Sequence, residues 1–326
     1  MERLSRKKKS KWKKGLIITG VIISVCFVSF VGYGFYLYHS VKEAANSVYK
    51  PLGKEKEQQP ALKDREKEGK VAKAQSSDEQ YPTSINILLL GVDERSGDKG
   101  RSDTMIVATL NKEKGSMMMT SIPRDTRVKI DGRSGYSKIN AAYAYGNEAL
   151  AVKTVEDYLN IDISYYVKVN MEGLSSLVDA VGGVTVNNTL DWTDDTIHFH
   201  FKKGTLSLNG KQALSYARER HRDPQGDFGR NDRQRQVIEG ILNKGKSFTA
   251  VTNMQDILNA LGNNVQTNLT FDDMKTLVTD YRQCRTNVTN YEVNGTPKMI
   301  DGVSFVLVDD KEFQHVHELI ANAMAY

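Results

Sequence analysis

INILLLGV, residues Ile85–Val92, is an almost continuous apolar run. A strand that is covered on both faces has this composition, because neither of its two sets of side chains meets water. The run therefore predicts the central strand of a sheet with helices on both sides. Charged residues follow directly, in Asp93 and in Gly100–Asp103. Ligand sites in open α/β sheets lie beyond strand ends, so a functional site is expected at this place.

Outward from this run, strand and helix patterns alternate along the chain. Strands are expected at residues 104–110, 116–122, 127–130, 165–170, 184–186 and 303–308. Helices are expected at residues 138–145, 148–159, 171–181, 210–217, 230–248 and 310–325, with further helix starts at Thr252 and Thr270. This alternation predicts an α/β domain whose helices cover both faces of the sheet.

The N-terminal segment predicts a membrane anchor. Residues 1–14 carry eight basic residues and one acidic residue, a net charge of +7, so the rest of a chain whose total is +5 sums to −2. The basic character therefore belongs to this tail and does not indicate nucleic-acid binding. Residues 15–38 contain no charge over 24 positions. As a helix they would span about 36 Å, enough to cross a hydrocarbon core of roughly 30 Å.

The same segment predicts the topology. A basic tail before an apolar helix stays in the cytoplasm, which places everything after residue 38 outside the cell. A cleaved signal peptide is the alternative, but no small-x-small cleavage site follows the run directly. Residues 39–82 are polar and charge-mixed, which is typical of a solvated stalk, and the folded domain is expected over residues 83–326.

A second charged region lies far downstream, at Tyr216–Gln234, read as YARERHRDPQGDFGRNDRQ. It holds five arginines, and Arg218 and Arg220 are two positions apart, so an extended segment would aim both guanidinium groups the same way. Guanidinium groups bind phosphate in a bidentate manner, which the ammonium of lysine cannot do. Gly226 and Gly229 allow the turns that would bring Asp227 and Arg230 back toward that pair.

The upstream charged residues suit the same kind of ligand. Asp93 and Asp103 border predicted strands, and two carboxylates with substrate phosphate oxygens are a common set of ligands for Mg²⁺. By themselves, two loop aspartates more often form turns or caps. Arg124 follows Pro123 at the end of another predicted strand, where the proline stiffens the chain and fixes a phosphate ligand in place.

These segments together resemble the LytR-CpsA-Psr family. Seven motifs occur in order over roughly residues 83–248: NILLLGVDE, GRSDTMIVAT, SIPRDT, KINAAYAYG, VGGVTV, LNGKQALSYARER and GDFGRNDRQRQV. The resemblance implies a three-layer α/β/α domain with a mixed central sheet and a tunnel for a prenyl chain. It also implies a membrane-anchored enzyme outside a Gram-positive cell, which moves a glycopolymer from an undecaprenyl-pyrophosphate carrier to peptidoglycan.

The resemblance also implies roles for individual residues. The metal-coordinating aspartates of the family match Asp93 and Asp103. Its pyrophosphate-binding arginines match Arg101, Arg124, Arg218 and Arg220, and its further active-site positions match Asp227, Arg230 and Gln234. No function is assigned to the segment 222–225, which is a variable loop in the family.

The implied reaction agrees with these residue types. A pyrophosphate diester is doubly negative, and arginines with Mg²⁺ would neutralise it and stabilise the charge on the leaving phosphate. The acceptor, expected from the family to be the 6-hydroxyl of N-acetylmuramic acid, needs a base or an orienting carboxylate, and Asp103 and Asp227 are both candidates. Wall teichoic acid is the first candidate polymer and capsule polysaccharide the second. A lipid-pyrophosphate hydrolase and a non-catalytic binding module remain alternatives.

Other chemistries fit less well. The sequence has neither a Gly-x-x-x-x-Gly-Lys-Ser/Thr phosphate loop nor a Gly-x-Ser-x-Gly elbow, and it has no DNA-binding motif. His198 and His200 are two apart, which favours an exposed strand over a zinc site. The tyrosines at 143, 145, 165 and 166 are expected to be half-buried packing residues rather than sugar platforms.

Overall fold

A computed structural model of the chain describes residues 38–53, 82–94, 100–245 and 262–325. It divides into two units, residues 1–45 and 46–326. Of the first unit, residues 38–45 are described and are helical. The expected basic tail, almost all of the expected membrane helix and the helix start at Thr252 lie outside the described residues. No helix within the described residues has the length and apolar character needed to cross a bilayer.

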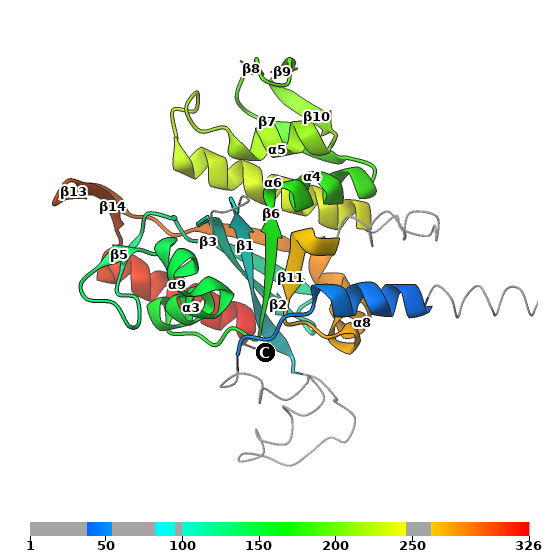
Figure 1. Cartoon of the computed structure of the whole chain (residues 1–326), viewed down its shortest axis with the longest axis horizontal. Coiled ribbons are helices and arrows are strands. Elements are labelled where there is room, and N and C mark those ends of the chain that lie inside the picture. Colours follow the sequence, from blue (N-terminus) through cyan, green and yellow to red (C-terminus); the bar gives the residue numbers. More distant parts are fainter. Residues whose placement is uncertain (1–37, 54–81, 95–99, 246–261, 326) are drawn as a thin grey trace, which may run out of the picture. The chain divides into compact units, whose positions relative to one another are not determined.

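A six-stranded mixed sheet forms the centre of the second unit (Figure 1), and its strand order is β11-β6-β1-β2-β3-β12. The apolar run INILLLGV lies in β1 (Ser84–Val92), which pairs antiparallel with β2 (Ser102–Asn111) and parallel with β6 (Tyr165–Asn170). Towards the edges, β2 pairs with β3 (Ser116–Ser121), which runs parallel to β12 (Val288–Glu292), and β11 (Val265–Thr267) pairs with β6. The predicted central strand is therefore confirmed.

Helices cover both faces of this sheet. Alternate side chains of β1 point to opposite sides: Leu88 and Leu90 join one apolar cluster, and Ile85 and Ile87 join another. The first cluster is completed by α3 (Ala141–Leu159) and α9 (Asp310–Met324). The second is completed by α8 (Phe271–Thr279), the short helix η3 (Arg282–Thr286) and part of α6 (Asp227–Gly245). The predicted α/β class with two covered faces is confirmed.

A group of helices and short strands lies beyond the end of β6 (Figure 1), and a third apolar cluster packs among these elements. It lies among α4 (Met171–Ala180), α5 (Gly210–Arg218), α6 and the antiparallel pair of β7 (Val184–Asn188) and β10 (Gly204–Leu208). Between these two strands, a hairpin joins β8 (Trp192–Asp194) to β9 (Phe199–Phe201), and the rings of Trp192 and Phe201 stack with their centroids 4.3 Å apart. His200 is in β9, as expected for an exposed strand, and His198 precedes it.

Two short hairpins and one further helical turn complete the second unit. β4 (Arg127–Val128) pairs with β5 (Ser137–Lys138), β13 (Thr296–Ile300) pairs with β14 (Val303–Leu307), and η2 is Gly262–Asn264. Two expected boundaries were inexact. Of the two helices expected at 138–145 and 148–159, the break between them is confirmed, because Gly146 and Asn147 are non-helical within α3; the first helix begins at Ala141, later than expected. Helix α6 begins at Asp227, earlier than expected, and this puts Asp227 in its first turn.

The folded domain begins before Thr83, so the expected boundary of the stalk was too late. The backbone N–H of Lys50 donates to the carbonyl of Thr267 at 2.7 Å, and the hydroxyl of Tyr166 donates to the carbonyl of Lys50 at 2.8 Å. Leu52 is buried in the same cluster as Leu88. This packing was not predicted, because the segment is mostly polar and much of its contact is through backbone atoms. Residues 54–81 lie outside the described part of the chain.

Candidate active site

A pocket of about 240 Å³ opens where the ends of the strands meet the helices of the third cluster. Its walls come from segments far apart in the sequence: the end of β1, the start of β2, the loop after β3, the start of α4, the end of α5 with the loop that follows it, and the first half of α6. The lining residues are Asp93, Asp103, Arg124, Met171, Ala217, Arg218, Arg220, His221, Arg230 and Gln234. The structure thus brings both charged regions of the sequence to one place.

Backbone hydrogen bonds fix the upstream residues of this pocket. The N–H of Asp93 donates to the carbonyl of Arg101 at 3.2 Å, which ties the end of β1 to the start of β2. Arg124 follows β3 in a turn closed by the N–H of Thr126 and the carbonyl of Pro123, 3.0 Å apart. The N–H of Asn140 donates to the carbonyl of Arg124 at 3.2 Å. The guanidinium of Arg124 is therefore carried by a restrained backbone.

Arg218 and Arg220 reach the pocket by a different route from the one expected. Arg218 is the last residue of α5, and the chain leaves the helix at Glu219, which has extended backbone angles. The two arginines therefore do not share one extended segment, and that premise was wrong. Both side chains nevertheless line the pocket.

Asp227 connects three arginines. Its Oδ2 lies 3.4 Å from Nε of Arg124, and its Oδ1 lies 3.2 Å from Nη1 of Arg230 and 3.8 Å from Nη1 of Arg220. Asp227 is not itself a lining residue, but its carboxylate contacts three residues that are. Since both oxygens are occupied by guanidinium groups, its main effect is to hold these groups in position around the pocket.

The carboxylate of Asp103 has fewer arginine partners than that of Asp227. Its Oδ1 accepts a hydrogen bond of 3.0 Å from Nη1 of Arg124, and the side chain is 28 % exposed. Its backbone carbonyl accepts a weaker contact of 3.4 Å from Nη2 of Arg230. A carboxylate with one arginine partner and access to the pocket can still accept a proton or bind a cation.

The pocket carries an excess of positive charge. Four arginines and two aspartates line it, and Arg218 has no ion pair with any residue that the structure describes. Among the residues that line the pocket, three buried polar atoms lack a hydrogen-bond partner within the described residues: Nε of Arg124, Nε of Arg230 and Oε1 of Gln234. Such atoms cost free energy unless a ligand or solvent satisfies them. The arrangement favours a ligand with more than one negative charge.

The pKa values of two arginines reflect this crowding. Burial lowers the pKa of Arg230 from its ordinary value, and the charges of Arg124 and Arg220 add to that effect while Asp227 opposes it. Burial also acts to lower the pKa of Arg124, but the carboxylates of Asp103 and Asp227 outweigh it, and the net shift is upward. Asp227 therefore opposes the loss of charge on both arginines.

The structure separates the expected site residues into two groups. Asp93, Asp103, Arg124, Arg218, Arg220, Arg230 and Gln234 line the pocket, and Asp227 contacts it. Arg101 is exposed and does not line the pocket; its contribution there is the carbonyl that accepts from Asp93. His221 and Met171 also line it and were not expected, although His221 stands between two arginines in the quoted stretch.

The donors for a divalent cation are limited but suitable. Asp93 and Asp103 face the same pocket, and two carboxylates with phosphate oxygens and water suit Mg²⁺. No group of three or more metal-ligating side chains occurs among the described residues. The side chains alone thus offer a two-carboxylate site, which fits Mg²⁺ when phosphate oxygens complete its coordination.

Two further arginines of α6 are enclosed rather than open. Arg233 pairs with Asp223 at 2.6 Å, and their side chains are 4 % and 9 % exposed. Arg235 donates to Oγ of Ser121 at 2.7 Å and lies 3.3 Å from Oε2 of Glu292. A Cβ at Gly229 would come within 1.9 Å of the Asp223 carboxylate, so only glycine fits beside this ion pair. The loop over residues 222–225 is therefore held by a structural contact.

The structure defines a mixed α/β protein with an arginine-rich pocket beyond its strand ends, an arrangement that suits phosphorylated ligands. Comparison with known proteins is more specific. The chain belongs to the LytR_cpsA_psr family, whose model matches residues 35–322, and the resemblance seen in the sequence is confirmed.

Individual relatives cover most of the chain. It is 40 % identical to the polyisoprenyl-teichoic acid–peptidoglycan teichoic acid transferase TagU of Bacillus subtilis (strain 168), over 95 % of this chain and 96 % of the relative. The crystal structure of B. subtilis TagU covers 74 % of this chain and 97 % of its own, with a TM-score of 0.61 and 38 % identity. A structure of TagT bound to LI-WTA covers 74 % and 91 %, with a TM-score of 0.62 and 30 % identity.

Proposed function

We propose that this protein transfers a glycopolymer from an undecaprenyl-pyrophosphate carrier to a sugar hydroxyl of peptidoglycan, and that the polymer is a wall teichoic acid. The observation that carries the proposal is the pocket itself, where four arginines surround a small space with two accessible carboxylates. The names of relatives at about 40 % identity support the choice of polymer and acceptor. A capsule polysaccharide transferred by the same mechanism is the second candidate.

The proposed reaction breaks one phosphoanhydride bond. The acceptor hydroxyl attacks the phosphorus next to the polymer, a new phosphodiester forms, and undecaprenyl phosphate leaves with the bridging oxygen. Negative charge accumulates on that leaving group. Arg124, Arg218 and Arg220 are placed to bind the pyrophosphate oxygens and to stabilise this charge, which is the main source of catalysis in phosphoryl transfer.

The two candidate carboxylates have different roles in this proposal. Asp227 is a positioning residue, since its oxygens contact three guanidinium groups. Asp103 lines the pocket and has a single arginine partner in side-chain contact, so it is the better placed to accept the proton of the hydroxyl. Arg230 and Gln234 complete the binding surface for the phosphates.

The proposal includes Mg²⁺ at Asp93 and Asp103. A bound Mg²⁺ would neutralise charge on the phosphate oxygens and help to orient them. Asp93 and Asp103 would hold it together with those oxygens.

We also propose that the protein is anchored in the cell membrane by residues 15–38, with residues 1–14 in the cytoplasm and the catalytic domain outside. The charge difference between the basic tail and the uncharged run supports this topology. Protease added to intact protoplasts should then degrade the domain over residues 83–326. Complete protection of that domain would contradict the topology.

The transfer itself is tested by the mass of the product. Full-length protein in detergent is incubated with a synthetic undecaprenyl-pyrophosphate-linked disaccharide and peptidoglycan oligomers. Transfer predicts an oligomer whose mass increases by one glycosyl phosphate. Free glycosyl phosphate alone would indicate a hydrolase, and tight binding without any product would indicate a binding module.

A further inference from the structure

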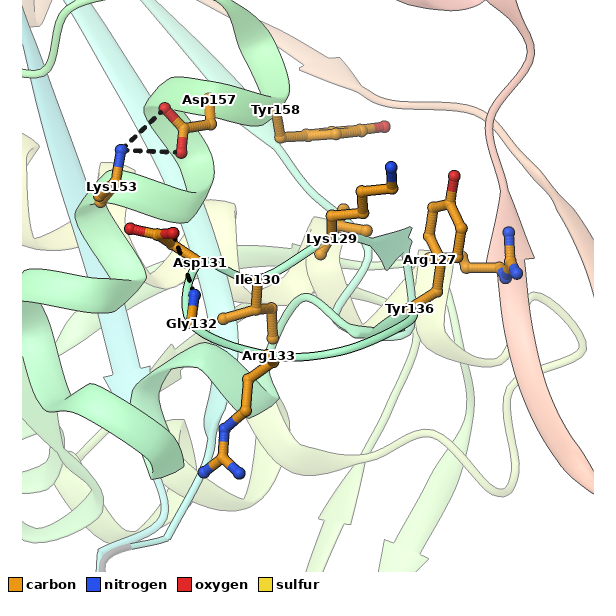
Figure 2. Close-up of a pocket in the computed structure, with 11 residues that line it drawn as sticks. Arg127, Lys129, Ile130, Asp131, Gly132, Arg133, Tyr136, Lys153, Asp157 and Tyr158 are labelled. Carbon is orange, nitrogen blue, oxygen red and sulfur yellow. Dashed lines mark hydrogen bonds and ion pairs between the residues drawn. The ribbon is translucent and has the colours of Figure 1, made fainter.

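A second pocket, of about 570 Å³, lies on a different part of the domain (Figure 2). One wall is the segment from Arg127 to Arg133 with Tyr136, which forms most of the β4–β5 hairpin. The other wall is the middle and end of α3, through Lys153, Asp157 and Tyr158. None of these residues belongs to the arginine pocket described above.

This pocket has more positive than negative side chains. Four cationic side chains and two carboxylates line it. Lys153 and Asp157 form an ion pair of 3.1 Å, and Oδ1 of Asp131 accepts a hydrogen bond of 3.0 Å from the N–H of Gly132 (Figure 2). Within the part of the chain that the structure describes, no carboxylate pairs with the three remaining cations, Arg127, Lys129 and Arg133. The pocket therefore has a net attraction for anions.

Aromatic rings hold these cations in place. The guanidinium carbon of Arg127 lies 3.7 Å from the ring centroid of Tyr136, and that of Arg133 lies 4.0 Å from the ring centroid of Tyr145. The ammonium of Lys129 is 5.6 Å from the same Tyr136 ring. Stacking restrains a guanidinium without using its N–H donors, so these donors remain available to a ligand. The Nε of Arg127 is buried and has no hydrogen-bond partner within the described residues.

The exposure of the two rings supports a role in binding. Tyr136 is 49 % exposed and Tyr145 is 46 % exposed, and both are among the most exposed large hydrophobic side chains of the described residues. Tyr145 is half-buried, as expected, and packs against Arg133; Tyr143, Tyr165 and Tyr166 are buried more deeply than expected. Because a guanidinium covers one face of each ring, the rings serve to order cations more than to stack on sugars.

The second pocket is connected closely to the first. Arg127 follows Arg124 by three residues, so their Cα atoms are at most about 11 Å apart. The connecting turn is rigid, because the N–H of Thr126 donates to the carbonyl of Pro123 and the carboxylate of Asp125 pairs with Lys138 at 2.9 Å. A polymer with its pyrophosphate end among the arginines of the first pocket could thus reach the second with its next charged groups.

We propose that this second pocket binds phosphodiester groups in the chain of the polymer that the first pocket transfers. The choice of a phosphate-bearing polymer follows from ordered guanidinium donors without carboxylate partners, which match phosphate oxygens in a bidentate manner. The identity of the polymer as the transferred substrate rests on the proposed function. The anion-binding property of the pocket does not.

Binding is tested with a probe that has neither lipid nor pyrophosphate, a synthetic poly(glycerol phosphate) oligomer, added to the full-length protein in detergent. Arg127→Ala and Arg133→Ala should each weaken binding about tenfold, because each removes charge-assisted hydrogen bonds to phosphate. Lys153→Ala is the matched control: it removes a cation from the same pocket that already has a partner, and its effect should be less than twofold. Thermal unfolding of each variant checks that the domain remains folded.

The role of the ring is tested separately. Tyr136→Phe keeps the stacking face and should bind the oligomer like the unmodified protein, while Tyr136→Ala should bind several-fold more weakly because Arg127 is no longer ordered. Equal binding by the unmodified protein and by both arginine variants would overturn the inference. So would a result in which a peptidoglycan oligomer, and not the glycerol phosphate oligomer, loses affinity in these variants.

Kinetics separate this inference from the proposed function. With a lipid-linked disaccharide, which carries no phosphodiester group for the second pocket to bind, Arg133→Ala should turn over normally. With a substrate that carries several glycerol phosphate units, the same variant should have a KM about tenfold higher at similar kcat. If no substrate is transferred at all but the oligomer still requires both arginines, the proposed function fails and the second site stands. If long and short substrates respond alike, the second site fails.

Discussion

Helix α6 carries two kinds of arginine: those that line the pocket and those that are enclosed in ion pairs inside the domain. Arg230 faces the pocket, where its carboxylate partner Asp227 is 31 % exposed and is shared with two other arginines. Arg233 is enclosed with Asp223, which is 9 % exposed and is its ion-pair partner. Both arginines are almost fully buried, so burial of the arginine alone does not distinguish them. What differs is whether the carboxylates around the arginine balance its charge.

This difference follows from the cost of burying charge. A buried ion pair is tolerated when its partners are complete, and removing one partner leaves the other without compensation. The arginine pocket has an excess of cations, so it is incomplete without an anionic ligand. We call the pocket arginines Arg124, Arg218, Arg220 and Arg230, with Asp103 and Asp227, the open set. We call Arg233 and Arg235, with Asp223 and Glu292, the enclosed set. Changes in the open set should act mainly on activity, and changes in the enclosed set mainly on stability.

The largest effect is expected in the open set. Arg218→Ala should lower kcat/KM for transfer by about 10²–10³-fold, because it removes stabilisation of the leaving phosphate. Its thermal midpoint should change little, since Arg218 has no ion pair with any described residue. Arg218→Lys should also transfer poorly, because a point charge does not replace the planar donor. Activity close to that of the unmodified protein in the lysine variant would rule out the bidentate role.

The next effect is expected in the enclosed set. Arg233→Ala should lower the free energy of unfolding by about 3–5 kcal/mol, because it leaves the Asp223 carboxylate buried without its partner. Urea denaturation measures this change. The double variant Arg233→Met with Asp223→Leu is the control, and it should be much closer to the unmodified protein because no charge remains unpaired. An unfolding midpoint unchanged in Arg233→Ala would contradict the structural assignment.

A smaller loss of activity is expected when the accessible carboxylate of Asp103 is changed. Asp103→Asn should keep the fold and most of the affinity for pyrophosphate lipid, but it should lower kcat on the order of 10²-fold because the proton acceptor is lost. If Mg²⁺ is held at Asp93 and Asp103, removing divalent cations with a chelator should reduce the rate of the unmodified protein as well. Normal turnover in both experiments would show that the arginines act without either contribution.

The smallest effect concerns the pH dependence of the enclosed set. Burial raises the pKa of Glu292 above its ordinary value of 4.5, although Asn231 and Arg235 oppose the shift. The folded state then holds the proton more tightly than the unfolded state, so this residue contributes more stability as pH falls through its folded pKa toward 4.5. In Glu292→Gln the contribution is absent.

Urea unfolding of both proteins, from neutral pH to about pH 4, measures that difference. The stability of the unmodified protein relative to Glu292→Gln should increase as pH falls. A difference that stays constant would show that the pairing with Arg235 offsets burial, and a change in the opposite direction would show that the pairing outweighs it.

Much of the fold could be predicted from local patterns. The run at Ile85–Val92 is apolar on both sets of alternating side chains, and this is why it revealed a covered central strand. The helix start expected at Thr270 is confirmed, because Thr270 forms a capping box with Asp273 at the beginning of α8. The packing of Lys50 and Leu52 on the domain could not be predicted, because it depends on partners more than a hundred residues away.

The site shows a similar limit. The types and spacing of Arg218, Arg220 and Asp227 predicted a phosphate-binding region, but not that Arg218 ends a helix or that Asp227 joins three arginines. The division between open and enclosed arginines on α6 also escaped prediction. It depends on which carboxylates the fold brings near, and Glu292 comes from a strand almost sixty residues further along the chain.

In the proposed reaction, the arginine pocket directs the breaking of one phosphoanhydride bond and the transfer of the polymer-side phosphate. Phosphorus NMR of the full-length protein with lipid-linked substrate and peptidoglycan oligomers follows both events. We expect the two pyrophosphate signals to be replaced by one phosphodiester and one monoester signal in equal amounts, and Arg218→Ala to leave the pyrophosphate signals in place. Pyrophosphate signals that persist with the unmodified protein, or two monoester signals without a phosphodiester, would contradict the proposed reaction.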